Sequence, residues 1–148
     1  MAPILIDTNV LVYIFDHHDE RRQERALNLV KSLESINQGR FSAQCLAEFF
    51  SVVTRKLIPP LSPSEAIKAI ELWMNAFPIY PLTSSIVLEA ARGVRDHHLA
   101  YYDAQIWATA RFNQIPLVFS EDFQDGRALE GVRFINPFSS EFNLGAWV

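Results

Sequence analysis

Apolar residues along this chain occur in two patterns, short uninterrupted runs and longer segments with helical spacing. Short runs without polar alternation are typical of strands that are buried on both faces of a parallel sheet. They predict strands at residues 4–6, around Phe41, and at 78–82, 117–119 and 132–135. Segments with apolar residues three or four positions apart predict helices from about residue 10 and over 19–37, 42–57, 62–77, 83–96 and 101–113. Strands and helices alternate, which favours one α/β domain over residues 1–148, with a small central parallel sheet between two layers of helices.

Local signals support these boundaries. The segment Ser62-Pro63-Ser64-Glu65 combines an N-cap, a proline at the first helical position and a glutamate at the third. Pro78 and Pro81 lie in one short run, and prolines place such a strand at a sheet edge or in a loop-like extension. The run at residues 4–6 has no such interruption and is predicted to be a central strand. From Asn136 onward we expect irregular structure.

Composition narrows the class of protein. The 148 residues are 49% hydrophobic and carry a formal net charge of −4, so binding to nucleic acid through bulk charge alone is not expected. Cys45 is the single cysteine, which excludes an intrachain disulfide and a cysteine-based zinc site. No apolar run approaches the length of a membrane span, and no secretory signal is visible at the N-terminus. We therefore expect a cytoplasmic protein without a membrane partner.

Acidic residues follow two of the predicted buried strands. Asp7 ends the first strand, and Asp122, preceded by Glu121, ends the strand at 117–119. Ligands of open α/β sheets bind at the carboxyl ends of parallel strands, so both carboxylates are expected at one edge. The alternative is that Asp7, with Thr8 and Asn9, only caps the next helix, because all three are good N-cap residues.

Two further acids lie on helices. Asp103 is in the first turn of its helix and shares a face with Ile106, Trp107 and Ala110, the face predicted to be buried. A carboxylate there is unusual, although the positive end of the helix dipole also favours an acid at this position. Glu48 lies roughly opposite the apolar stripe of its helix, and a solvated charge is its simplest interpretation.

Taken together, Asp7, Glu48, Asp103 and Asp122 suggest an oxygen-rich metal site. Carboxylates that converge without basic partners repel one another, and a hard cation such as Mg²⁺ or Mn²⁺ relieves the repulsion. Such a cation activates water for phosphodiester hydrolysis. Thr8, Asn9 and Ser120 are candidates for orienting a ligand or a water molecule through hydrogen bonds.

Three segments and the residue Glu48 resemble the PIN-domain family. The segments are Ile6-Asp7-Thr8-Asn9-Val10-Leu11 near the start, Tyr101-Tyr102-Asp103-Ala104-Gln105-Ile106-Trp107-Ala108-Thr109-Ala110, and Val118-Phe119-Ser120-Glu121-Asp122-Phe123. Glu48 matches mainly by its spacing. The resemblance covers nearly the whole chain and includes the closing Asn136-Pro137-Phe138. It implies a PIN-like three-layer α/β/α fold and a ribonuclease that depends on Mg²⁺ or Mn²⁺.

The resemblance also implies roles for individual residues. Asp7, Glu48, Asp103 and Asp122 are carried over as the catalytic acids, with Asp7, Asp103 and Asp122 as metal ligands. Ser120 stands where the family more often has threonine, and the hydroxyl is retained. Glu121 directly precedes the matching aspartate and Asp125 follows it, so the sequence leaves open whether either of them assists or replaces Asp122.

Single-domain PIN proteins of this kind resemble VapC-type toxins of bacterial toxin–antitoxin pairs. This likeness implies an RNA substrate, a cognate antitoxin protein and a homodimer. The helices at 19–37 and 62–77 carry more apolar residues than a domain of this size needs to bury, and an exposed apolar patch usually marks an interface.

Six basic residues are candidates for phosphate contacts, although any one of them is better explained as an ordinary solvated charge. The candidates are Arg21, Arg22, Arg25, Arg40, Lys56 and Arg127.

Two other functions fit parts of the sequence. A metal-dependent phosphatase with an aspartyl nucleophile usually needs a strand-end Asp-x-Asp and a late lysine, whereas Asp7 is followed by Thr8-Asn9 and no lysine follows Lys68. A catalytically weak module with the same fold that binds RNA or a protein partner is the second alternative, and the complete set of acids argues against it. His17-His18 and His97-His98 match no zinc-binding spacing.

Overall fold

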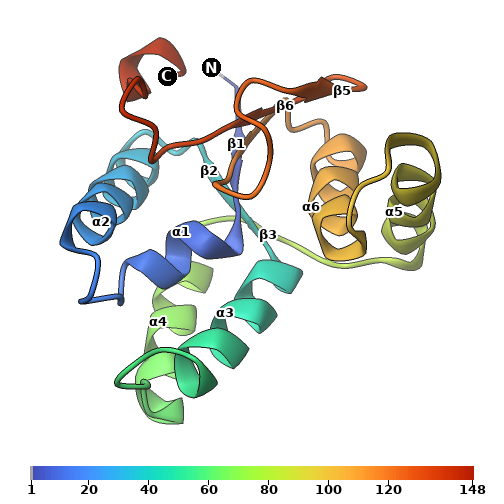
Figure 1. The fold of residues 1–148 in the computed structure, drawn as a ribbon. Helices are drawn as coiled ribbons and strands as arrows, with labels where there is room; N and C mark the ends of the chain where they lie inside the picture. Colours follow the sequence, from blue (N-terminus) through green and yellow to red (C-terminus); the bar gives the residue numbers. More distant parts are fainter. Residues whose placement is uncertain (1) are drawn as a thin grey trace.

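A sheet of six strands forms the centre of residues 2–148, the part of the chain that the computed structural model describes (Figure 1). The strands are β1 (Ile4–Ile6), β2 (Gly39–Ser42), β3 (Ile79–Tyr80), β4 (Leu117–Phe119), β5 (Ala128–Leu129) and β6 (Val132–Ile135). Their order is β3-β2-β1-β4-β6-β5, and neighbouring strands run parallel except for β5 and β6. The prediction of a central first strand and an edge strand between the two prolines is confirmed.

The antiparallel strand β5 is a difference from the predicted all-parallel sheet. It has only two residues, with Ala128 exposed, so it gives no periodic signal. A tight turn joins it to β6, with φ of 48° at Glu130 and 86° at Gly131. Left-handed conformations at both central residues suit a two-residue hairpin turn.

Helices cover both faces of the sheet. They are α1 (Thr8–Tyr13), α2 (Glu20–Ser35), α3 (Ala43–Arg55), α4 (Pro63–Ala76), α5 (Ser84–His97) and α6 (Tyr101–Phe112), followed by a 3-10 turn at Leu144–Ala146. In Figure 1 the strands lie between α2 on one side and the α5–α6 pair on the other. The three-layer α/β/α fold predicted from the sequence is therefore confirmed. No helix within residues 2–148 is both long and apolar enough to cross a membrane.

The capping residues define the helix starts as predicted. Ser42 accepts a hydrogen bond from the backbone N–H of Cys45, and Thr83 accepts one from that of Ile86. Ser62 and Glu65 form a complete capping box. Ser42 is also the last residue of β2, so α3 begins directly at the carboxyl end of that strand.

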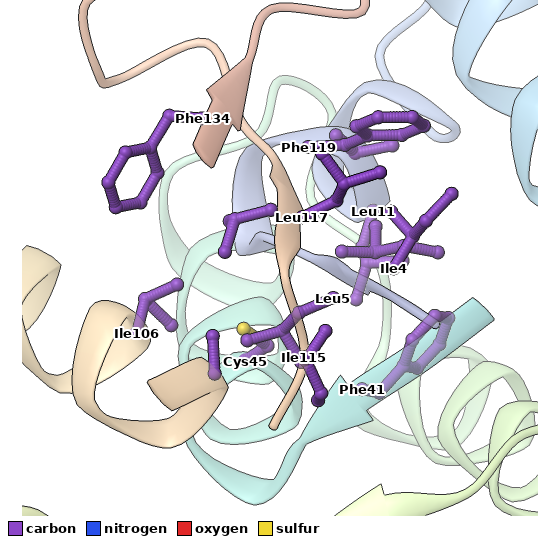
Figure 2. Close-up of a cluster of buried hydrophobic side chains, with 14 of the residues drawn as sticks. Ile4, Leu5, Leu11, Phe41, Cys45, Ile106, Ile115, Leu117, Phe119 and Phe134 are labelled. Carbon is purple, nitrogen blue, oxygen red and sulfur yellow. The ribbon is translucent and has the colours of Figure 1, made fainter. Parts of the chain in front are cut away.

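The core lies on both sides of the central strands. Ile4, Leu5 and Ile6 have no exposed surface, as expected for a strand buried on both faces. Figure 2 shows Leu5 and Leu117 of neighbouring strands among side chains from the helices, with Ile106 of α6 close by. Phe41 of β2 stacks on Phe77 with ring centroids 4.5 Å apart. This packing fixes the strand ends from which the candidate site is built.

A close contact between α5 and α6 fixes the helix that carries Asp103. A Cβ atom on Gly93 would lie 2.7 Å from Cζ3 of Trp107, so only glycine allows this approach of the two helices. Trp107 is fully buried, and its Nε1 donates a hydrogen bond to the carbonyl of Leu129 in β5 at 3.2 Å. The indole thus joins α6 to α5 and to the β5–β6 hairpin.

Candidate active site

Asp7 lies at the carboxyl end of the central strand. Its backbone N–H donates to the carbonyl of Phe119 at 3.0 Å, which extends the pairing of β1 and β4 by one residue. Only 3% of the residue is exposed. Carboxylate oxygen Oδ1 accepts the N–H of Thr8 at 2.7 Å, and Oδ2 accepts the hydroxyl of Ser120 at 2.7 Å. Asp7 therefore caps α1 and also belongs to a network that joins two strands, so the two interpretations open at the sequence level are compatible.

Ser120, which directly follows β4, connects the start of the next loop to Asp7 and to α1. It has no exposed surface, and its hydroxyl oxygen accepts hydrogen bonds from Asn9 Nδ2 at 3.2 Å and from the N–H of Asp122 at 3.0 Å. Asn9 Oδ1 in turn accepts the N–H of Glu121 at 3.4 Å. Ser120 and Asn9 thus orient Asp7 and the start of the loop that carries Asp122.

Glu48 is half-buried rather than fully solvated. Its Oε2 accepts the hydroxyl of Thr8 at 3.1 Å, and its Oε1 accepts the side-chain amide of Gln44 at 2.6 Å. The helical wheel predicted a solvated charge, whereas in the structure the face of α3 opposite its apolar stripe turns toward the start of α1. Gln44, which sequence reasoning missed, precedes Glu48 by one helical turn.

The four acids Asp7, Glu48, Asp103 and Asp122 are close enough to influence one another electrostatically. Burial raises the pKa of Asp7 from 3.8 to about 7, against the hydrogen bonds from Ser120 and Thr8, and the charges of Asp122 and Glu48 raise it further. The pKa of Asp103 is also raised, first by burial and then by the charges of Asp122 and Glu48. No cationic side chain contributes to either shift. The four acids therefore interact at one edge of the sheet without a basic partner.

The donor set of this edge suits a hard cation. Asp7, Asp103, Asp122 and Glu48 supply oxygen only, and Mg²⁺ and Mn²⁺ prefer such ligands together with water. Within residues 2–148 no three acidic, histidine or cysteine side chains already form a complete ligand cage. The buried Asp7 carboxylate, with acidic neighbours and no counter-charge, nevertheless fits a divalent cation.

The two other acids of the β4 loop are engaged elsewhere. Glu121 accepts the hydroxyl of Tyr13 at 2.6 Å and pairs with Arg22 Nε at 2.7 Å. Asp125 Oδ1 accepts the N–H of Asn136 at 2.9 Å. Asp122 is exposed, and its side chain makes no hydrogen bond among the described residues. This difference favours Asp122 as the acid available to a ligand.

Cys45 is a neighbour of Asp7 that the sequence did not reveal. Its Sγ lies 3.9 Å from Oδ1 of Asp7, and the residue has no exposed surface. Burial, followed by the charge of Asp7, raises the pKa of the thiol to about 12. The thiol is therefore a buried weak donor beside Asp7, not a reactive nucleophile.

The sequence matches the PIN domain family over residues 4–125. This match spans most of the 148 residues. The chain belongs to the PIN-domain family. A comparison with curated proteins found no match.

Solved structures share the PIN fold at low sequence identity. The VapC20 toxin of Mycobacterium tuberculosis, which cleaves the sarcin–ricin loop, is 20% identical, with a TM-score of 0.65 over 88% of this chain and 98% of that one. A toxin–antitoxin complex from Klebsiella pneumoniae has 19% identity and a TM-score of 0.65 over 90% and 97% of the two chains. DNA-bound VapBC from Salmonella typhimurium has 18% identity and a TM-score of 0.62 over 90% and 97%.

Most of the predicted phosphate-binding cations make internal contacts in this PIN domain. Arg21 donates to the carbonyl of Phe138, and Arg25 donates to the carbonyls of Pro137 and Ser139. Arg40 donates to the backbone carbonyls of Asn37, before its strand, and of Gly39, the first residue of the strand. Arg22 donates to the Glu121 carboxylate. Within residues 2–148, Lys56 and Arg127 make neither a side-chain hydrogen bond nor an ion pair. Arg21 and Arg25 therefore hold the C-terminal segment against α2.

An apolar groove lies between α2 and α4 of the PIN domain. Its volume is about 460 Å³, and Leu27, Val30, Leu72 and Trp73 contribute to its lining. Leu72 is 64% exposed and Leu27 is 38% exposed. The prediction of surplus apolar surface on these two helices is confirmed.

Proposed function

We propose that this PIN domain is a metal-dependent endoribonuclease that acts as the toxin of a toxin–antitoxin pair. The observation that supports it most is the buried Asp7 carboxylate, whose charged neighbours are other acids and not cations. Such a site is costly to ionise without a divalent cation. The shared fold with a toxin that cleaves the sarcin–ricin loop supports RNA as the substrate.

In this proposal Asp7, Asp103 and Asp122 hold Mg²⁺ or Mn²⁺, and Glu48 assists them. The bound cation supplies an activated water and stabilises charge on a phosphoryl oxygen. Ser120 and Thr8 keep the Asp7 carboxylate in place through its two oxygens. Thr8 also holds Glu48, so one residue couples two of the acids. Lys56 and Arg127 remain available as phosphate contacts.

Removal of metal tests the proposed activity. We expect cleavage of a labelled single-stranded RNA in Mg²⁺ or Mn²⁺, and a loss of at least about 100-fold in EDTA that added Mg²⁺ restores. Linkage predicts that the same cation raises the melting temperature, because it binds the folded protein. Cleavage that continues unchanged in EDTA would rule out the metal-dependent mechanism, and no cleavage under any metal would favour a binding module.

A protein partner is the second part of the proposal. The apolar groove between α2 and α4 suits an apolar antitoxin segment, and the solved structures that share the fold include toxin–antitoxin complexes.

The predicted homodimer is tested by light scattering of the chain alone. A monomer at micromolar concentration would contradict this prediction. We expect the protein to act in the cytoplasm, consistent with its single free cysteine.

A charge in the groove should weaken the complex with the antitoxin. For Leu72→Asp we expect at least a tenfold weaker affinity for the protein encoded by a short reading frame directly upstream, measured by calorimetry. An exposed carboxylate there must be desolvated on binding, whereas the free protein should lose little stability. Leu88→Asp on α5 is a matched control, because Leu88 is 74% exposed and lies outside the groove. Equal affinities for the two variants would place the partner elsewhere.

A further inference from the structure

Gln44 is a buried polar residue beside the acids that neither the family resemblance nor the sequence pattern selected. It is on the first turn of α3, and only 7% of it is exposed, although glutamine is mostly a surface residue. Burial of an uncharged amide is unfavourable unless its hydrogen-bonding groups have partners. The partners of this amide therefore indicate why it is there.

The Gln44 amide connects two elements that carry acids. Its Nε2 donates to Oε1 of Glu48 at 2.6 Å and to the backbone carbonyl of Tyr102 at 3.0 Å. Both partners are acceptors, so only the amide nitrogen fits between them, which fixes the orientation of the amide. Tyr102 directly precedes Asp103 in α6. One side chain thus joins the Glu48 carboxylate on α3 to the helical turn that carries Asp103.

The orientation of Glu48 depends on this contact. Thr8 holds Oε2 of the carboxylate and Gln44 holds Oε1, so each oxygen has one donor. Glu48 also follows Gln44 by one helical turn, a spacing at which two side chains meet on a helix. Without the amide, the carboxylate keeps only the Thr8 contact and gains freedom to rotate.

The other end of the amide is left unsatisfied. Oε1 of Gln44 is buried and has no hydrogen-bond partner among the described residues. A buried acceptor without a hydrogen-bond partner lowers the stability of the fold, so its presence needs an explanation. Here the explanation is that Nε2 of the same amide donates two hydrogen bonds, to Glu48 and to the carbonyl of Tyr102.

We infer that Gln44 is a positioning residue that aligns Glu48 with the start of α6, so that Glu48 and Asp103 would serve the same cation site. This inference rests on the proposed function, because it assigns Gln44 a role in that site. Partners that orient metal-site carboxylates typically change metal affinity or activity by about 10-fold to 100-fold when they are removed.

A matched pair of variants separates this role from ordinary packing. Gln44→Met keeps the length of the side chain and removes its donor. Gln38→Met is the control, because Gln38 is 3% exposed, donates to the carbonyl of Ala2, and also has a buried Oε1 without a partner. For Gln44→Met we expect Mn²⁺ affinity, followed by electron paramagnetic resonance without RNA, to fall about 10-fold. We expect kcat to fall about 10-fold to 100-fold, with KM changed less than threefold, whereas Gln38→Met should stay within twofold of wild type in each.

A double-mutant cycle tests whether Gln44 acts through Glu48. In a Glu48→Gln background, Gln44→Met should have almost no further effect on Mn²⁺ affinity, since the carboxylate that it positions is gone. Melting in EDTA checks that each variant is folded. If Gln44→Met does not melt cooperatively, Gln44→Asn replaces it, because the shorter amide cannot reach both acceptors.

The outcomes distinguish the inference from the function on which it rests. A wild type that neither binds Mn²⁺ nor cleaves RNA overturns both. The inference alone is overturned if the wild type binds Mn²⁺ and cleaves RNA, but Gln44→Met and Gln38→Met have the same Mn²⁺ affinity and the same cleavage kinetics. An effect of Gln44→Met that is equally large in the Glu48→Gln background also overturns it, because Gln44 would then act independently of Glu48.

Discussion

Asp7→Asn is expected to lower the rate of Mg²⁺-dependent RNA cleavage by about 100-fold to 10,000-fold. The substitution removes the charge of the most buried acid at the site. The cap of α1 should remain, because the asparagine oxygen can still accept the N–H of Thr8. Single-turnover cleavage rates at saturating Mg²⁺ measure the effect.

The same variant should be more stable than wild type in EDTA. The pKa of Asp7 is 3.8 when unfolded and about 7 when folded, so ionisation opposes folding and the wild type loses stability as the pH rises through this window. Asparagine does not titrate. The advantage of Asp7→Asn should therefore be larger at pH 8 than at pH 5, by up to about 3 kcal/mol, and should fade toward pH 4. Urea unfolding at these pH values measures it.

Asp19→Asn is the matched control for a capping aspartate. Asp19 caps α2 through the N–H of Arg22 and is not among the four acids. The hydrogen bond from the backbone N–H of Arg22, followed by the Arg22 side chain, lowers the pKa of Asp19. The loss of this carboxylate should therefore reduce stability near neutral pH, which is the opposite sign to Asp7→Asn. Cleavage should stay within twofold of wild type. If Asp7→Asn kept full activity and the full Mg²⁺-induced rise in melting temperature, Asp7 would be a helix cap only.

Asp122→Asn and Glu121→Gln are expected to have very different effects on cleavage. Asp122 is exposed and its carboxylate is free of internal hydrogen bonds within residues 2–148, so its loss should lower kcat by about 100-fold or more. Glu121 is held by Tyr13 and Arg22, so Glu121→Gln should lower kcat less than tenfold and mainly reduce stability. Cleavage kinetics of both variants measure the effect on kcat, and urea unfolding measures the effect on stability.

Asp125→Asn provides the reference for this pair. Asp125 accepts the N–H of Asn136 through one oxygen, which asparagine also supplies, so activity and stability should both be close to wild type. A Glu121→Gln variant as inactive as Asp122→Asn would show that Glu121 itself serves the reaction.

The sequence alone determined most of the helices and strands, and it placed two of the four acids, Asp7 and Asp122, at the same edge of the sheet. Uninterrupted apolar runs, helical spacing and capping residues located the strands and helices, because these signals depend on neighbours only a few residues apart. Asp7 and Asp122 could be placed together, since β1 and β4 are parallel and buried and each acid follows the end of its strand. The two-residue strand β5 escaped prediction because it has too few residues for any periodicity.

Tertiary structure decided what each polar side chain contacts. A helical wheel assigns Glu48 and Gln44 to faces of α3, but only packing brings Thr8 of α1 and Tyr102 of α6 against those faces. Likewise, Arg21, Arg22 and Arg25 suggested phosphate contacts by charge alone, whereas the fold directs them to the C-terminal segment and to Glu121. Periodicity in the sequence tells on which face of its own helix a side chain lies. It does not tell which residue that side chain contacts, because the contacting residue is distant in the sequence and its position depends on how the layers of the fold pack.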